Sequence, residues 1–160
     1  MLSALGHNPT IAIRDFTGDV SLDPSAPEDA TLRIQIRAGS LEVTDDIKRA
    51  DRMEMESTMN EKVLESARHP TITFEGSANS ANGGGRFQVN LSGALSLRGR
   101  TNRVPVTVQV ALMGDMLWAS GEFSLLQSSY GIPLVSVAGG ALKLKDELKF
   151  VFDIVARKQE

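Results

Sequence analysis

Apolar and polar residues alternate along several stretches of this sequence, and a repeat of two is typical of a β-strand with one buried face. The longest run places Val104, Val106, Val108, Val110 and Leu112 in one phase. Similar runs cover residues 32–37, 87–97, 117–125 and 148–154. Because an amphipathic helix would repeat its apolar residues every three or four positions, these runs predict an all-β domain.

The predicted strands are interrupted at recognisable places. Near the start, Ile11 and Ile13 occupy one phase, whereas Phe16, Val20 and Leu22 occupy the other, which predicts a β-bulge or bend. Clusters of Gly, Pro, Asn and Asp predict the turns between strands. These turns lie at Asp23-Pro24, which with Pro27 closes the first hairpin, and at 82–85, 99–102 and 114–115.

The segment from Thr44 to Arg68 has no alternation and predicts one or two short helices. Met55, Met59 and Val63 recur there at a spacing of four, and Pro70 stops the pattern. Such a helix, placed between strands, would close one end of a barrel.

Two further predictions concern the start of this helical segment and its methionines. Asp45 and Asp46 are expected to cap its start. Met53, Met55 and Met59 are expected to pack the helix against the sheet; the alternative is an adaptable lid over an apolar ligand, because thioethers fit irregular shapes.

Composition excludes several classes of protein. The 160 residues fit a single domain, taken as 1–160, and the absence of cysteine excludes disulfides, thiolate metal sites and cysteine nucleophiles. A formal net charge of −3 gives no general attraction to nucleic acid or an anionic membrane, although a local basic patch remains compatible with it. No apolar run approaches the ~20 residues that span a bilayer, so we expect a soluble protein without stable membrane insertion. It would be cytoplasmic as written, or periplasmic if an upstream signal was removed.

No motif in the chain predicts catalysis or a cofactor. The two histidines, His7 and His69, lie far apart, and His69 before Pro70 is expected to have a capping or surface role. Gly83 to Gly85 lack the Lys-Ser/Thr of a phosphate loop and fit a hairpin turn. The carboxylates of Asp45, Asp46, Asp51, Glu54 and Glu56 lack the spacing of a calcium loop and fit a helix start and a solvated helical face. We therefore expect no metal, no cofactor and no enzyme activity.

The predicted interior is the remaining candidate site. A barrel of about eight strands is either just filled by side chains or holds one small ligand. Inward positions are mostly Val, Leu and Ile, and Gly93, Ala119 and Gly121 among them are expected to leave room. An interior lined only by hydrocarbon suits an apolar chain. The residue pattern fits both an interior cavity and an interior filled by side chains.

Five segments, in order along nearly the whole chain, resemble the YceI-like domain family. They are 15–24 (Asp-Phe-Thr-Gly-Asp-Val-Ser-Leu-Asp-Pro), 69–76 (His-Pro-Thr-Ile-Thr-Phe-Glu-Gly), 91–106 with its Leu-x-x-x-Gly-Arg-Thr-Asn core, 123–132 ending in Ser-Ser-Tyr-Gly-Ile, and 145–148 (Lys-Asp-Glu-Leu). The resemblance implies a lipocalin-like antiparallel β-barrel of about eight strands with a short helical insert. It also implies an internal pocket for a polyisoprenoid or quinone-like lipid, and a homodimer.

The sequence departs from that family at two places. An apolar strand usually precedes the position of Ser3 to His7, so either the start is trimmed or the barrel has an open seam that another element, such as a second subunit, covers. The 44–68 insert also lacks the family's Arg-Asp-x-His-Leu-Arg pattern, which removes support for a lid or head-group contact there.

We thus expect a non-catalytic protein that binds, stores or transports an isoprenoid-type lipid, with no nucleic-acid partner. The alternative is an interaction or scaffold protein with a side-chain-filled barrel. The predicted pocket-lining residues, which would supply shape and hydrophobic contact only, are Ile34, Ile36, Ile72, Phe74, Val89, Leu91, Leu95, Val106, Val108, Phe123, Phe150 and Phe152.

Overall fold

A computed structural model describes residues 9–83, 86–134, 136–137, 142–143 and 145–159. Its main feature is a seven-stranded antiparallel sheet in the order β11-β8-β7-β6-β5-β3-β2. The strands are β2 (Phe16–Asp23), β3 (Ala26–Arg37), β5 (Thr71–Gly83), β6 (Arg86–Leu97), β7 (Arg100–Met113), β8 (Met116–Leu126) and β11 (Glu147–Arg157). Two short pairs accompany it: β1 (Ile11–Ala12) with β4 (Glu42–Val43), and β9 (Ser136–Val137) with β10 (Leu142–Lys143).

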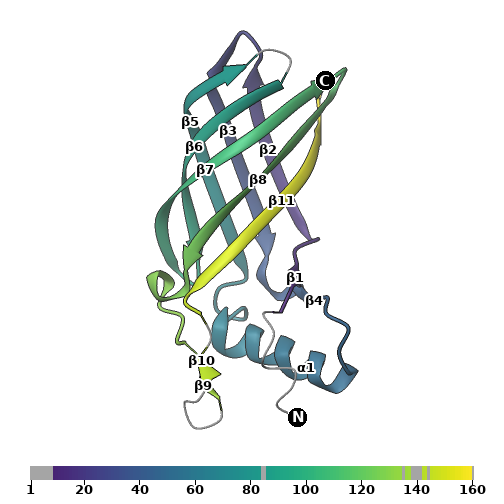
Figure 1. The fold of residues 1–160 in the computed structure, drawn as a ribbon, viewed down its shortest axis with the longest axis vertical. Coiled ribbons are helices and arrows are strands. Elements are labelled where there is room, and N and C mark those ends of the chain that lie inside the picture. Colours follow the sequence, from purple (N-terminus) through teal and green to yellow (C-terminus); the bar gives the residue numbers. More distant parts are fainter. Residues whose placement is uncertain (1–8, 84–85, 135, 138–141, 144, 160) are drawn as a thin grey trace.

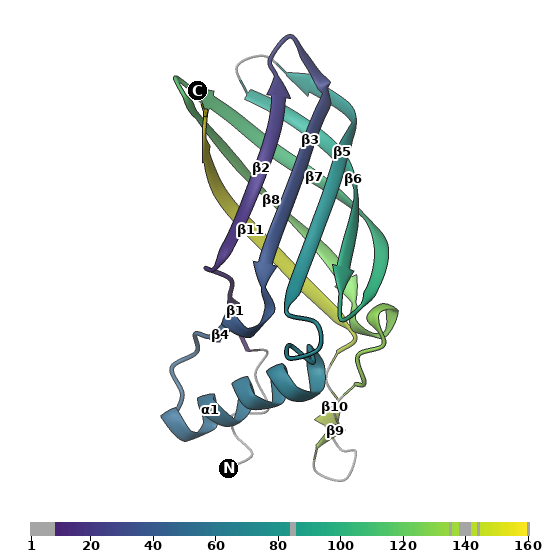
Figure 2. The same ribbon diagram turned by 180° about the vertical axis from the view of Figure 1, so that it is seen from behind.

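The long sheet curls into a half-barrel. Strands β2, β3 and β5 form one wall, and β7, β8 and β11 cross it on the other side (Figures 1 and 2). Strands β2 and β11 are the two ends of the hydrogen-bonded order, and no pairing joins them among the described residues. The antiparallel barrel-type fold with a helical insert is therefore confirmed, but the curl has seven strands and an open seam between β2 and β11.

The strand pattern in the sequence accounts for the sheet. Along β6, inward residues are buried and outward ones are half-buried or exposed, as the repeat of two requires. The β6–β7 turn consists of Arg98 and Gly99, which both have positive φ (53° and 72°), as in the tight turns that match the twist of antiparallel strands. The turn predicted at 99–102 is wrong in its bounds, because residues 100–102 already pair with residues 95–97 as the start of β7. The predicted turns at Asp23-Pro24 and Gly114-Asp115 also join consecutive strands, whereas Gly84 and Gly85 lie outside the described residues.

The phase change near the start is a break between two strands. Ile11 and Ala12 pair with Val43 and Glu42 in the small sheet, and β2 begins only at Phe16. The predicted bend is therefore present, and it separates the long sheet from a small pair near the helix (Figure 1). His7 lies outside the described residues.

The helical insert is confirmed as α1 (Arg49–Thr58), which continues into a π-helical turn, η3 (Met59–Val63). It lies across the lower end of the half-barrel (Figures 1 and 2). The predicted cap is wrong: the helix begins after Lys48 with no side-chain cap, and the Asp45 carboxylate instead accepts a hydrogen bond from Thr10 N at 2.8 Å.

Methionine packing in the helix is only partly as predicted. Met59 is buried in the core with Leu64, and Met55 is half-buried, but Met53 is 59% exposed. No residue of α1 itself is buried, so the apolar packing of this segment begins only at Met59, and Met53 faces solvent. No helix in the described part of the chain has the length and apolar character needed to cross a bilayer.

Candidate functional site

The inner face of the half-barrel is an almost uninterrupted apolar surface. The strand register places Val20, Leu32, Gly76, Gly93 and Val104 in one row across five strands. A second row shares β5, β6 and β7 with the first and continues onto β8 and β11; it joins Ala81, Val89, Val108, Gly121 and Phe152. In the row that contains Ile34, Phe74 and Leu95, the fourth residue is Asn102, a polar side chain near the helical end.

Burial of this face decreases from the middle of the sheet to its two edges. Most inward side chains on β6 and β7 are buried, whereas most of those on β3 and all of those on β11 are half-buried. On β2, at the seam, Phe16 and Val20 are still 40% and 38% exposed. The apolar surface therefore remains accessible along the seam.

All of the predicted pocket-lining residues lie on this inner face, as their registers and burial patterns show. Six are buried in the core, namely Ile72, Val89, Leu91, Leu95, Val106 and Val108. The other six are half-buried, namely Ile34, Ile36, Phe74, Phe123, Phe150 and Phe152. The pattern missed Phe16 and Val20 on β2, at the seam, and Leu32 on the neighbouring β3, which share this face; their in-phase alternation was the available signal.

The expectation that glycines leave empty room is wrong at two positions. Gly76 and Gly93 pair directly across β5 and β6, and the ring of Phe74 lies over both: a Cβ on Gly76 would meet ring Cε1 at 2.9 Å. Gly121 is covered in the same way, since a Cβ there would meet Phe152 Cζ at 2.7 Å. Aromatic rings therefore occupy the space that these glycines provide.

This arrangement also decides where the rings lie. A ring within van der Waals distance of a glycine backbone rests against the wall of the sheet instead of projecting toward the opposite wall. Phe123 and Phe150 show a related packing, because they are directly opposite on β8 and β11 and stack with centroids 5.1 Å apart and planes at 8°. The rings of Phe74 and Phe152 thus cover glycines on the face, whereas those of Phe123 and Phe150 pack against each other.

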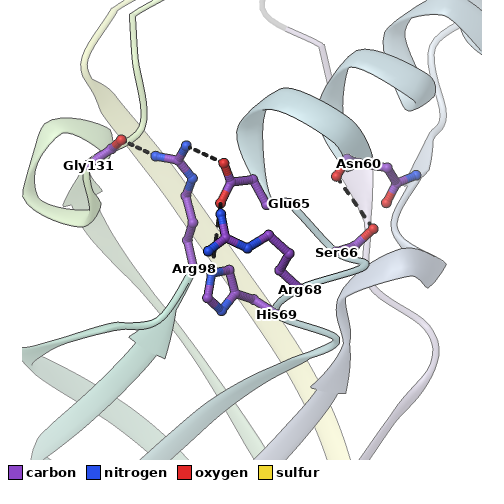
Figure 3. A network of polar contacts seen from close by, with 7 residues as sticks. All are labelled: Asn60, Glu65, Ser66, Arg68, His69, Arg98 and Gly131. Carbon is purple, nitrogen blue, oxygen red and sulfur yellow. Dashed lines mark hydrogen bonds and ion pairs between the residues drawn. The ribbon is translucent and has the colours of Figure 1, made fainter.

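A polar network joins the helix end to two loops at the base (Figure 3). The Arg98 guanidinium donates to the carbonyl of Gly131 and, at 3.1 Å, to Glu65 Oε1. The other Glu65 oxygen lies 3.8 Å from both Arg68 Nη1 and His69 Nε2. Because Arg98 and Glu65 are only 16% and 28% exposed, these contacts fix the base of the half-barrel.

His69 has a structural position in this network. Its backbone N–H donates to Glu65 O at 2.9 Å. Its ring is half-buried and packs beside the β6–β7 turn, where a Cβ on Gly99 would meet His69 Cε1 at 2.8 Å. Nothing in the sequence pattern identified Glu65 or Arg98, since partners from separate loops leave no periodic signal.

Two titratable groups at the base have shifted pKa values. The hydroxyl and backbone N–H of Ser128 both donate to Asp146, and these bonds hold the pKa of that carboxyl below its ordinary 3.8. Burial raises the pKa of the Tyr130 hydroxyl above 10.0, against a smaller opposing effect of Asn102. Both groups belong to the structure around η4 (Gln127–Tyr130) and not to the inner face.

A second concavity of about 540 Å³ lies between α1 and the start of β2. Its charged groups are already engaged: Arg37 pairs with Asp15 at 2.7 Å, and Arg14 with Glu42 at 3.0 Å. Glu56 accepts a hydrogen bond from Val43 N. The groups in this cleft stabilise the contact between helix and sheet, and the apolar inner face remains the candidate site.

Relatives of known structure share this architecture. BcnA of Burkholderia cenocepacia is 22% identical with a TM-score of 0.72, covering 91% of this chain and 86% of that one. The YceI protein of Campylobacter jejuni is 12% identical with a TM-score of 0.72, over 96% and 87%. A polyisoprenoid binding domain from Saccharophagus degradans is 14% identical with a TM-score of 0.68, over 93% and 85%. At these identities the likeness shows the fold.

Sequence comparison assigns the family. The UPF0312 protein of Azotobacter vinelandii is 30% identical over 102 residues, which are 64% of this chain and 48% of that protein, so the match spans about half of its length. The model of the YceI-like domain matches residues 3–156, which is nearly the entire chain. This protein therefore belongs to the YceI-like domain family.

Proposed function

We propose that this protein binds a long apolar lipid chain of isoprenoid type along the inner face of the half-barrel, and stores or carries it without chemical change. The observation that carries the proposal is the gradient of burial on that face. A continuous apolar surface runs from the buried middle strands to Phe16 and Val20, which remain 40% and 38% exposed at the seam. An apolar surface left open to solvent along a concave sheet is typical of a binding site.

The energetics favour a hydrocarbon ligand. A chain that buries about 300 Å² of apolar surface gains roughly 7 kcal/mol at ~25 cal/mol per Å². Part of that gain is offset by the loss of translational and conformational freedom of the chain. Half-buried side chains such as Ile34 and Phe74 would lose their remaining water contact at the same time.

The chemistry of the face supports a binding role. Apart from Asn102, the inward residues in the paired rows described above are apolar or glycine, so this surface offers no acid, base or nucleophile to a bound chain. The choice of an isoprenoid rests on likeness to the polyisoprenoid binding domain from Saccharophagus degradans, while the geometry itself supports an apolar chain.

A second candidate is a non-catalytic interaction protein, and the open seam favours it. Strands β2 and β11 both end the sheet, and an unpaired edge can accept an added strand from another chain. In that case the inner face would be covered by a polypeptide strand in place of a lipid.

Native mass spectrometry of the purified protein, followed by organic extraction, tests the proposal. Val20→Glu places a charge on the inner face, at a side chain that is already partly exposed to solvent. Ser21→Glu is the matched control, because it places the same charge one residue away on the outer face. We expect a bound polyprenyl or quinone mass in the parent protein and in Ser21→Glu, and its loss in Val20→Glu. Circular dichroism establishes that both variants are folded.

The contrary outcome is equally clear. A protein that stays empty after incubation with polyprenyl lipids and quinones would overturn the lipid proposal. Recovery of a stoichiometric polypeptide at the seam, lost in Val20→Glu, would support the interaction protein instead.

A further inference from the structure

The β7–β8 hairpin carries apolar side chains on both of its faces. Its inward residues, Leu112 and Leu117, pack against the core. Its outward residues, Met113 and Met116, face each other across the pair, and Met113 is 68% exposed. The outer face of an antiparallel sheet is normally polar, so apolar side chains on the outer face of this hairpin indicate a binding surface.

The apolar surface continues across the outer wall next to this tip. Ala111, Trp118 and Val155 are direct cross-strand neighbours on β7, β8 and β11, and Val155 is 51% exposed. The next row toward the helix, in contrast, contains Gln88, Gln109, Ser120 and Asp153. The apolar group is therefore a bounded patch at one end of the wall.

Basic residues surround this patch. Arg86 is paired with Ala111 and Arg157 with Met116, and Lys158 follows at the same edge. The acidic group among them is Asp115, which lies 3.9 Å from Arg157 and whose backbone carbonyl accepts from Lys158 N. Asp153 lies at the boundary. We name this surface the hairpin-end patch; it comprises Ala111, Met113, Met116, Trp118, Val155, Arg86, Arg157 and Lys158.

We propose that the hairpin-end patch docks on an anionic lipid bilayer surface. Exposed methionine and valine would enter the boundary between headgroups and acyl chains, tryptophan suits that boundary, and the basic residues would meet anionic headgroups. In and around the patch, three basic side chains stand against two carboxylates, Asp115 and Asp153, which is an excess of one positive charge in a chain of net charge −3 and favours a negatively charged partner.

The location of the patch fits this partner. Helix α1 covers the lower end of the half-barrel, whereas the end of β11 and the β7–β8 hairpin lie at the opposite end (Figures 1 and 2). There the apolar inner face reaches the hairpin tip through Leu112 and Leu117. Docking at this end would bring the inner face next to the bilayer, although docking itself requires no bound cargo.

Vesicle partitioning tests the proposal directly. The vesicles are phosphatidylcholine with or without about one third phosphatidylglycerol, and they contain no isoprenoid lipid, so the result is independent of the proposed cargo. Trp118 is the sole tryptophan of the chain and reports insertion through its emission and its quenching by brominated lipid. We expect binding to the anionic vesicles, a blue shift of Trp118 emission, and weaker binding at high salt.

Matched variants locate the contact. Met113→Glu combined with Val155→Glu is expected to lower partitioning at least about tenfold, and Lys158→Gln alone about fivefold. Val151→Glu is the control, because Val151 lies on the same strand and outer wall, 73% exposed, but outside the patch. It should bind like the parent protein.

Three outcomes would overturn the proposal. They are no partitioning of the parent protein to anionic vesicles at low salt, an equal loss in Val151→Glu, or sedimentation showing that the double variant only converts a dimer to a monomer. The last result would assign the patch to a second copy of the chain.

Discussion

The ring of Phe74 lies across Gly93, and Gly93 is paired directly with Gly76, over which the same ring extends. Two facing glycines thus form a flat floor for one aromatic side chain on the inner wall. A side chain at either position would lift the ring away from the sheet. The glycines therefore act through the position of Phe74, which determines how far the inner surface extends toward the opposite wall.

Gly93→Ala is expected to push the Phe74 ring into the space between the walls, because the three atoms nearest to the new Cβ all belong to that ring. Overpacking of this kind costs roughly 1–3 kcal/mol of stability. We also expect uptake of a polyprenyl lipid to fall severalfold. Chemical denaturation and lipid titration measure the two effects.

The double variant Gly93→Ala with Phe74→Leu tests the cause, since leucine is shorter and leaves room for the added methyl group. It should recover much of the lost uptake. Ala94→Ser, on the outer face of the same strand, is the control and should leave uptake unchanged. Uptake in Gly93→Ala equal to that of the parent protein would show that the ring does not limit the ligand space.

Arg98→Asn is expected to destabilise the fold by about 2 kcal/mol, because the guanidinium bonds the Gly131 carbonyl and the partly buried Glu65. Among residues other than glycine, asparagine is one of those that best tolerate the positive φ of 53°. The loss of stability therefore reports the lost guanidinium contacts and not backbone strain. Arg103→Ala removes an exposed arginine that bonds Ser92 and should change stability by less than about 0.5 kcal/mol. Similar losses in the two variants would contradict the structural role of Arg98.

The strands and the identity of the inner face could be predicted from the sequence because both depend on local periodicity. Val104 to Leu112 alternate without interruption, and their burial follows the same alternation in β7. The choice of Ile34, Phe74 or Phe150 as inward residues required only the phase of each strand. Their assignment as ligand contacts stays a prediction.

Closure of the sheet, glycine packing and the polar base could not be predicted, since they depend on contacts between distant segments. An open seam was one of the two alternatives that the missing first strand left, and alternation within β2 and β11 could not choose between them, because the seam follows from the pairing of whole strands. The rings over Gly93 and Gly121 belong to residues on neighbouring strands. The alternation within one strand does not show which residues of the next strand lie beside it. Asp45 suits a helix start in sequence, but its carboxylate is engaged by Thr10 N from another segment.

Acid is expected to weaken the fold partly through Asp146. Because hydrogen bonds from Ser128 lower the folded-state pKa below 3.8, this carboxylate stabilises the fold above the unfolded-state pKa. That contribution is lost as the pH falls through the folded-state pKa. The melting temperature of Asp146→Asn should therefore change less between about pH 5 and pH 2 than that of the parent protein.

Ser128→Ala provides the matched variant, because it removes the largest cause of the Asp146 shift and keeps the carboxyl group. Its acid dependence should lie between those of the parent protein and Asp146→Asn, because the backbone N–H of residue 128 still donates to the carboxylate. Parallel pH profiles for the parent protein and both variants would show that this pair does not contribute to acid sensitivity.

Tyr130 is the sole tyrosine of the chain and only 1% exposed, so its ionisation can be followed alone through tyrosinate absorbance. Burial raises its folded-state pKa above 10.0, and the neutral form therefore stabilises the fold fully below pH 10.0. This contribution is lost as the pH rises through the folded-state pKa. We expect the absorbance midpoint of the folded protein to lie above that of the denatured chain, and Asn102→Ala to move it higher, because the Asn102 side chain opposes the effect of burial on this pKa. A midpoint at or below the denatured value, in protein still folded by circular dichroism, would show that water reaches the Tyr130 hydroxyl and that the base of the half-barrel opens in solution.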